Sequence, residues 1–268
     1  MLKLRIVTAT VLVALLVPSL FLLPSAGWTL LCTLAIAGCA WEWGRLSGLN
    51  LPGRIAYAAG VGGAAGWLAM AQIDHQGWYV TATVFWCVLA PWLLWRRPAF
   101  QGPWFRLILG LVVLLPVELA LIDLRGVSPG LLLTVMAIVW ISDSAAYFAG
   151  RNFGRNKLAP AVSPGKTWEG VYGALAAVLV YAIICVMLMA PLVIPRWSGS
   201  MTAGSVFVVL LWLFLAAGGI VGDLLESLLK RAAGVKDSGR MLPGHGGILD
   251  RVDALLPILP VAALFYLR

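Results

Sequence analysis

Long apolar blocks recur along the whole sequence, and they constrain the fold more than any other feature. Most of them hold about 17–25 residues, the length at which a helix crosses the roughly 30 Å hydrocarbon core of a bilayer. Nine blocks can be distinguished, at residues 6–23, 28–44, 55–73, 78–95, 105–122, 131–150, 170–194, 202–225 and 254–267. Charged residues make up only 11% of the chain, less than half the share usual in soluble domains. We therefore predict an all-α, polytopic integral membrane protein of about nine transmembrane helices.

The first and last blocks each allow a second interpretation. The first, Ile6 to Leu23, is longer than the apolar region of a signal peptide, and no clear A-x-A cleavage pattern follows it. We interpret it as a first spanning helix. The last block is short and contains Pro257 and Pro260, so eight crossings are an alternative to nine.

The formal net charge of +8 is explained by membrane topology. If the N-terminus is cytoplasmic and every block crosses once, only Arg125, Arg196 and Arg268 of the 19 lysines and arginines fall on the far side. This asymmetry satisfies the positive-inside rule. The basic excess therefore does not require a nucleic-acid partner, and we predict none.

Both long loops, residues 151–169 and 226–253, fall on the cytoplasmic side in this arrangement. Functional residues usually lie on loops that a rigid scaffold holds, so we expect the active site to face the cytoplasm. Residues 1–100 carry few polar landmarks and are interpreted as N-terminal membrane scaffold helices. Residues 101–268 then form the C-terminal catalytic membrane region.

Small residues give two further indications. The four cysteines all lie inside apolar blocks without a CxxC or Cys/His cluster, which indicates neither a zinc site nor a disulfide framework. Glycines at GxxxG spacing, Gly62 with Gly66 and Gly218 with Gly222, predict close helix packing. The pattern leaves open whether the packing is within the chain or between two copies.

Carboxylates gather around the second long loop. Asp223, Ser227 and Lys230 follow one another at i, i+4 and i+7, which places them on one face of a helix. Asp250 and Asp253 are three residues apart and also share a face. Ionisable groups near membrane depth are costly and usually functional, and Mg²⁺ commonly takes one or two carboxylates plus substrate phosphates. Solvated helix ends that carry ion pairs are the alternative.

Polar groups also lie near the first long loop. Asp143 falls in the inner half of an apolar block, which favours a functional role. The GKT of SPGKTWEG is not a P-loop, because Pro160 occupies the position of the first glycine and no strand is expected before it. Ser163, Lys166 and Thr167 still form a candidate phosphate clamp beside a helix start.

The segment KDSGRMLPGHGG is rich in glycine and ends where the helix of Asp250 would begin. Gly246 and Gly247 would let the backbone approach a ligand, and a helix N-terminus favours phosphate. His245 could donate to a phosphate or cap a turn, and the sequence leaves both interpretations open.

The run SLLKRAAGVKDSGRMLPGHGGILDRVD, from Ser227 to Asp253, resembles the signature of phosphatidate cytidylyltransferases, the CDP-diglyceride synthases. The segments DSAAYFAGRNFG and SPGKTWEG are similar to segments of that family as well. The signature covers 27 of the 268 residues, and the length and hydropathy pattern fit over the rest.

The resemblance implies an enzyme of phospholipid biosynthesis that makes CDP-diacylglycerol and pyrophosphate from CTP and phosphatidic acid. It also implies Mg²⁺, a monovalent cation such as K⁺ beside it, a bacterial-type cell inner membrane and a homodimer. The expected catalytic residues are Asp223, Asp250, Lys230, Lys236, Asp237, Arg251 and Asp253. The residues expected to bind substrate phosphates are Ser163, Lys166, Thr167, Ser227, Arg231, His245, Gly246 and Gly247. The expected metal ligands are Asp223, Asp250, Asp253 and Asp143.

Two other classes of function are alternatives to this one. A transporter or channel would also carry carboxylates in a membrane, but these charges crowd toward one face and no paired broken helices recur in two halves. A related enzyme that acts on another lipid phosphate, or a lipid kinase, would share much of the pattern. The spaced pattern of CDP-alcohol phosphotransferases is missing from the sequence.

Overall fold

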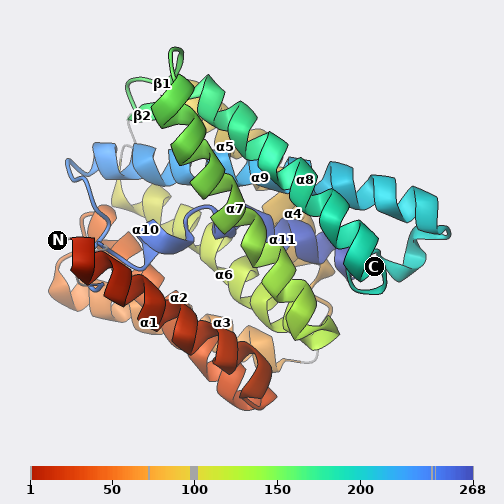
Figure 1. The fold of residues 1–268 in the computed structure, drawn as a ribbon. Helices are drawn as coiled ribbons and strands as arrows, with labels where there is room; N and C mark the ends of the chain where they lie inside the picture. Colours follow the sequence, from red (N-terminus) through yellow and green to blue (C-terminus); the bar gives the residue numbers. More distant parts are fainter. Residues whose placement is uncertain (1, 72, 97–101, 243, 245, 268) are drawn as a thin grey trace.

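The computed structural model describes residues 2–71, 73–96, 102–242, 244 and 246–267 (Figure 1). Each apolar block of the sequence forms helix. The long helices are α1 (Leu2–Leu22), α2 (Ser25–Leu46), α3 (Leu51–Met70), α6 (Pro103–Val127), α7 (Pro129–Phe153), α8 (Trp168–Val193) and α9 (Met201–Ala232). The shorter helices are α4 (Gln76–Val84), the π-helix η1 (Phe85–Leu89), α5 (Ala90–Arg96), the 3₁₀-helix η2 (Arg196–Ser198), α10 (Leu249–Val252) and α11 (Leu255–Tyr266).

The predicted all-α class is confirmed except for a small hairpin inside the first long loop. Strands β1 (Lys157–Ala159) and β2 (Ser163–Thr167) pair antiparallel, with Lys157 opposite Thr167 and Ala159 opposite Ser163. The hairpin leads directly into α8, whose first turn is capped because the Thr167 hydroxyl accepts a hydrogen bond from Gly170 N at 3.2 Å.

Five stretches of the described chain are long and apolar enough to cross a membrane. They are the continuous stretch Gln76–Arg96, which holds α4, η1 and α5, and the helices α6, α7, α8 and α9. Helices α2 and α3 have 22 and 20 residues, but tryptophan and polar groups in α2, and glycine, proline and Arg54 in α3, reduce their mean hydropathy. The structure therefore supports a multi-pass membrane protein, and the predicted number of nine crossings is not confirmed.

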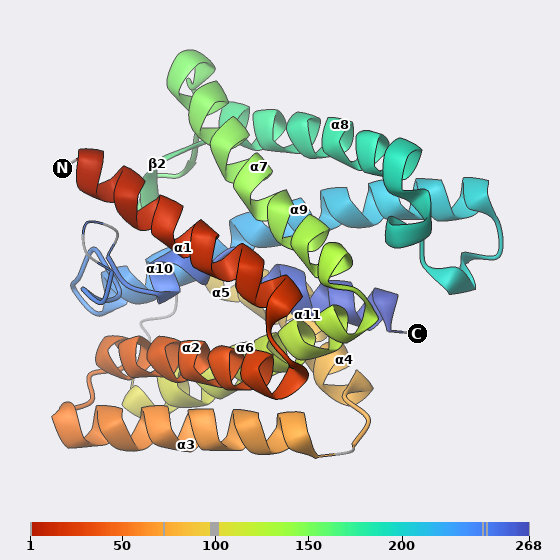
Figure 2. The same ribbon diagram turned by 60° about the horizontal axis from the view of Figure 1, so that its bottom comes forward.

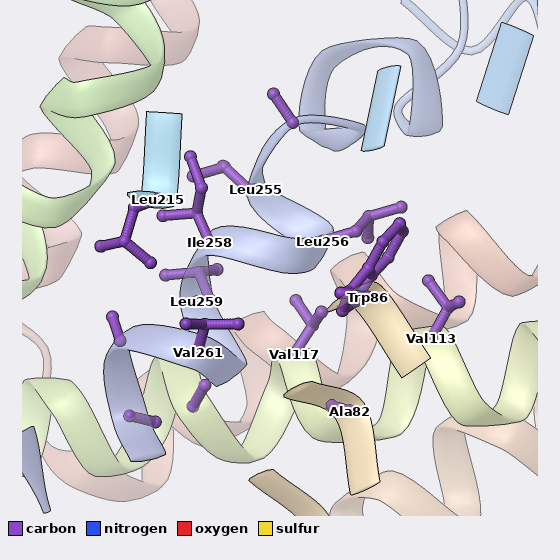
Figure 3. Close-up of a cluster of buried hydrophobic side chains, with 14 of the residues drawn as sticks. Ala82, Trp86, Val113, Val117, Leu215, Leu255, Leu256, Ile258, Leu259 and Val261 are labelled. Carbon is purple, nitrogen blue, oxygen red and sulfur yellow. The ribbon is translucent and has the colours of Figure 1, made fainter. Parts of the chain in front are cut away.

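Helix α11 lies at the centre of the bundle, between α4, α6 and α9 (Figures 1 and 2). Its ten side chains from Leu255 to Leu264 are all buried. Figure 3 shows Leu256 beside Trp86 of η1, and Ile258 beside Leu215 of α9. A helix that is apolar on every side is stable only when it is enclosed, and 12 residues span about 18 Å, less than a bilayer core. The last apolar block is therefore a core helix, and it anchors α10 immediately before it.

The predicted boundaries of the long loops were wrong where helices continue into them. Helix α9 runs on to Ala232, so residues 226–232 are helical rather than part of a loop. The reason is that Leu225, Leu228 and Leu229 remain buried and extend the apolar face of α9 beyond the predicted end of its block. In the first loop, α7 likewise reaches Phe153 and α8 begins at Trp168.

Both GxxxG pairs pack inside the chain. A Cβ atom on Gly62 would lie 3.0 Å from the Ala37 side chain of α2, so the small residues of α3 allow α2 to come close. A Cβ atom on Gly222 would lie 2.5 Å from the carbonyl oxygen of Asp253 and 2.8 Å from the Pro257 ring. The second pair thus brings α9 against the segment that joins α10 to α11.

The turn between α2 and α3, the β1–β2 hairpin and the connection from α9 to α10 all lie at the same end of the bundle (Figures 1 and 2). We call this the loop end, and we call residues 233–248 the glycine-rich loop. Contacts from three separate parts of the chain meet there, and they build the candidate site.

Candidate active site

Asp223 lies near the loop end of α9, on the helix face that the sequence predicted. Its carboxylate accepts a hydrogen bond from the Ser227 hydroxyl at 3.3 Å, one helical turn further along. Its other oxygen lies 2.6 Å from Lys166 Nζ, which β2 carries from the first long loop. The hairpin therefore delivers a lysine to the carboxylate of α9, across 57 residues of sequence.

Lys230 connects the same helix to the short helix α10. Its ammonium group lies 2.7 Å from Asp250 Oδ1 and also pairs with Glu226, one turn back on α9. Lys230 is 9% exposed and Glu226 is 1% exposed, so both charges are removed from bulk water. A buried charge is tolerated only when it is paired and hydrogen-bonded. Lys230 has two carboxylate partners, whereas Glu226 is paired through Oε2 and its Oε1 has no hydrogen-bond partner among the described residues.

Asp250 is held from two sides. Its Oδ2 accepts backbone hydrogen bonds from Ser238 N at 3.0 Å and from Gly247 N at 2.8 Å. Burial alone would raise the pKa of Asp250, but the hydrogen bonds from Lys230 and Gly247 outweigh it and lower that pKa below its ordinary value. The group is thus kept ionised, which is the form a metal ligand requires.

Two further carboxylates face the same region. Asp143 of α7 is close enough to Asp223, Lys166 and Arg251 for their charges to act on it. Burial raises the pKa of Asp253, and the negative charges of Asp223 and Asp143 act in the same direction. Carboxylates from α7, α9 and the start of the last helical segment therefore repel one another across a shared space, which a cation would relieve.

Glu42 of α2 is a residue of the site that the sequence interpretation missed. It is fully buried, and its carboxylate accepts hydrogen bonds from Ser238 Oγ at 2.9 Å, Ile248 N at 3.1 Å and Leu249 N at 2.9 Å. These donors belong to the glycine-rich loop and to the start of α10, so Glu42 caps the helix that carries Asp250. A buried acid in an apolar block was the available signal, but nothing in its local pattern names a partner about 200 positions away.

Glycine is required at several positions of the glycine-rich loop, because the loop backbone passes close to other groups of the site. A Cβ atom on Gly247 would lie 2.2 Å from Glu42 Oε2 and 2.2 Å from Ser238 Oγ, and one on Gly239 would lie 2.0 Å from Glu42 Oε1. Gly246 has a φ of 85°, a conformation that side-chain-bearing residues rarely adopt. Glycine therefore lets the loop wrap tightly around the Glu42 and Asp250 carboxylates.

The other predicted site residues take different positions. Thr167 is buried as the cap of α8, and Ser163 is half-buried at the start of β2. Arg231 donates to the carbonyl oxygens of Val162 and Val235, so it ties the hairpin to the loop. Lys236, Asp237 and Arg251 are exposed, as is Arg231. His245 lies outside the described residues.

The oxygen-rich donor set fits a hard divalent cation by chemistry, although the described residues contain no ready-made cluster of three or more metal-binding side chains. Lysine ammonium groups lie against both principal carboxylates, Asp223 and Asp250. A site of this kind would be completed by the phosphates of a substrate, as is common for Mg²⁺.

The fold and the site define a helical, multi-pass membrane protein whose loop end gathers carboxylates, lysines and a glycine-rich backbone. The sequence profile of the cytidylyltransferase family matches residues 3–267, and the chain belongs to this family. The family that the sequence resemblance indicated is therefore confirmed.

Three relatives illustrate the similarity. A phosphatidate cytidylyltransferase of Pseudomonas aeruginosa is 41% identical over 98% of this chain and 96% of its own length. One of Haemophilus influenzae is 34% identical over 99% of both chains. One of Bacillus subtilis is 47% identical over 46% of this chain and 42% of its own length.

Proposed function

We propose that this protein transfers the cytidylyl group of CTP to phosphatidic acid and forms CDP-diacylglycerol and pyrophosphate. The similarity to phosphatidate cytidylyltransferases over nearly the whole chain supports this activity. The observation that carries it is the convergence of the signature residues at the loop end, where Lys230 and two backbone amides hold Asp250.

The same proposal places the protein in a bacterial-type inner membrane with the loop end toward the cytoplasm. The positive-inside rule supports that orientation, because the loop end carries most of the lysines and arginines. CTP is a cytoplasmic nucleotide, whereas phosphatidic acid lies in the bilayer, so a site at a membrane surface can reach both substrates. The resemblance further supports a homodimer and a monovalent cation such as K⁺.

The reaction consists of one displacement at phosphorus. A phosphate oxygen of phosphatidic acid forms a bond to the α-phosphorus of CTP, and the bond from that phosphorus to the oxygen bridging the β-phosphorus breaks. The electron pair leaves with pyrophosphate. Because the second pKa of a phosphate monoester is near 6, the nucleophile is already mostly dianionic at pH 7 and needs no strong general base.

The residues of the site would therefore act mainly by positioning and by neutralising charge. Lys166 is partly exposed where it contacts Asp223. Its ammonium group would bind one phosphate group as a point charge. Arg251 is exposed, its charge acts on Asp143, and in this scheme it would contact another phosphate in a bidentate manner. Lys230 keeps its contacts with Glu226 and Asp250, and in this scheme it positions Asp250 rather than the substrate.

Mg²⁺ bound by Asp223 and Asp250, with Asp253 and Asp143 beside them, would neutralise charge on the phosphates and on the pyrophosphate leaving group. The role of the chain is to bring these four carboxylates to the same space and to keep Asp250 ionised. The capped start of α10 and the buried anchor α11 keep Asp250 and Asp253 on the side of α9 that carries Asp223.

The test is release of pyrophosphate by purified full-length protein in detergent, measured with and without phosphatidic acid and with and without Mg²⁺. We expect release only when CTP, lipid and Mg²⁺ are all present, and an Asp250→Asn variant should lose it. The variant must keep the elution volume and thermal midpoint of the wild type. Lipid-independent release, or no release from well-folded wild-type protein, would refute the proposed function, and consumption of ATP in place of CTP would indicate a lipid kinase.

A further inference from the structure

A second cluster of charge lies at the loop end, on the side of the glycine-rich loop that faces α2 and α3. A pocket of about 530 Å³ opens there. Its lining residues are Trp41, Glu42, Arg45, Arg54, Gly239, Arg240 and Met241. The volume is that of a small-molecule site, and three guanidinium groups border it.

The arginines of this pocket have no carboxylate partner among the described residues. Glu42 is the pocket's acid, but its oxygens accept their hydrogen bonds from the loop and from the start of α10. No ion pair joins it to Arg45, Arg54 or Arg240 in the described chain. Three positive charges therefore face one carboxylate that is already fully engaged.

The individual contacts show that two of these arginines are held in place. Arg54 stacks over the Trp41 ring at 4.0 Å, and its Nε is shielded from solvent without a hydrogen-bond partner among the described residues. Arg45 donates to the Ser238 carbonyl oxygen at 3.3 Å. Arg240 is exposed on the loop opposite them. Pre-positioned guanidinium groups of this kind bind phosphate, with planar and often bidentate hydrogen bonds.

The pocket is continuous with the candidate active site through one residue. The backbone N–H of Ser238 donates to Asp250, whereas its carbonyl oxygen accepts from Arg45 and its hydroxyl donates to Glu42. A ligand in the pocket would therefore lie on the opposite side of the same loop segment that holds Asp250.

We propose that Arg45, Arg54 and Arg240 form a binding pocket for a phosphate group of a substrate. The inference rests on the proposed function, which supplies two phosphate sources at this surface. One is the triphosphate of CTP, which the adjoining Asp250 loop favours. The other is the headgroup of phosphatidic acid, which suits the exposed apolar side chains of Leu51 and Ile55 beside Arg54 on α3.

The experiment compares Arg54→Gln and Arg240→Gln with the wild type, because these two arginines make no hydrogen bond to the loop among the described residues. Arg96→Gln is the matched control, since Arg96 also lies over a tryptophan ring, at 4.8 Å, but outside the pocket. Binding is measured without turnover in two arms: equilibrium dialysis with CTP in the absence of lipid, and native mass spectrometry with phosphatidic acid in the absence of CTP. The KM for each substrate is then measured in the full reaction.

We expect each pocket variant to weaken one phosphate ligand about tenfold, in binding and in KM, because a hydrogen bond to a charged group is lost. A loss confined to the CTP arm identifies the triphosphate, and a loss confined to the lipid arm identifies the headgroup. Unchanged binding in both arms, or an equal loss in Arg96→Gln, overturns the proposal. The binding arms do not depend on catalysis, so absence of pyrophosphate release from the wild type would count against the proposed function alone.

Discussion

Replacement of Glu42 tests whether a residue of the N-terminal half controls the candidate site. Glu42→Ala would remove the acceptor of three hydrogen bonds, from Ser238 Oγ, Ile248 N and Leu249 N. Each bond to a charged acceptor contributes about 1.5–3 kcal/mol, and buried donors left without a partner add a penalty. Because the three bonds share one carboxylate, their contributions are not additive, and we take about 3 kcal/mol as the lower estimate for the local structure.

A local cost of about 3 kcal/mol corresponds to about a hundredfold change in the equilibrium between the native and a displaced position of the glycine-rich loop, in favour of the displaced one. Glu42→Ala should therefore lower kcat at least about a hundredfold. Glu42→Gln preserves the side-chain volume and one acceptor oxygen, so it should retain two of the hydrogen bonds and lose about tenfold. This graded order distinguishes loss of a capping carboxylate from loss of packing.

The assay is pyrophosphate release per mole of monodisperse protein, accompanied by limited proteolysis of the glycine-rich loop. Glu118→Gln serves as the control, because Glu118 is a fully buried acid on α6 that contacts Thr33 rather than the loop. It should keep activity within about twofold per folded molecule. Wild-type kcat and an unchanged cleavage pattern in Glu42→Ala would refute the capping argument.

Three further predictions concern the same site. Gly247→Ala should lower activity at least about tenfold, because its Cβ would lie 2.2 Å from Glu42 Oε2 and overpacking costs about 1–3 kcal/mol. Gly63→Ala, which has open space around its Cβ, should be neutral in the same assay. Equal activities of the two variants would contradict this prediction. Asp223→Asn should abolish turnover but change the free energy of unfolding by less than about 1 kcal/mol, because Asp223 and Lys166 are partly solvent-exposed. Retained turnover would contradict the assignment of Asp223 to the active site. Excess EDTA should stop pyrophosphate release and added Mg²⁺ should restore it, and release that persists in EDTA would exclude a required metal.

Much of the local architecture could be predicted from the sequence. The apolar blocks predicted the positions of the helices, because a chain in a bilayer must satisfy its backbone hydrogen bonds internally. The spacing of Asp223 and Ser227 predicted their shared face on α9, and a hydrogen bond now joins them. These features depend on residues within one or two helical turns, which is the range over which periodicity carries information.

The sequence was less informative about how far each helix crosses. The short, proline-containing last block resembled a tilted or partial span, yet α11 is enclosed by other helices on all sides. An apolar helix in contact with lipid and one in contact with protein have the same hydropathy. Only the packing of α4, α6 and α9 around α11 separates the two cases.

The sequence by itself determined the helical membrane class, the family and the chemical types of the site residues. Only the tertiary structure decided which of them meet: Lys166 with Asp223, Lys230 with Asp250, and Glu42 with the backbone of Ile248 and Leu249. Glu42 is separated from Ile248 by 206 positions in the sequence and from Leu249 by 207. Such contacts leave no local periodicity, because they are set by the close approach of α2 to the glycine-rich loop and not by the residues beside Glu42.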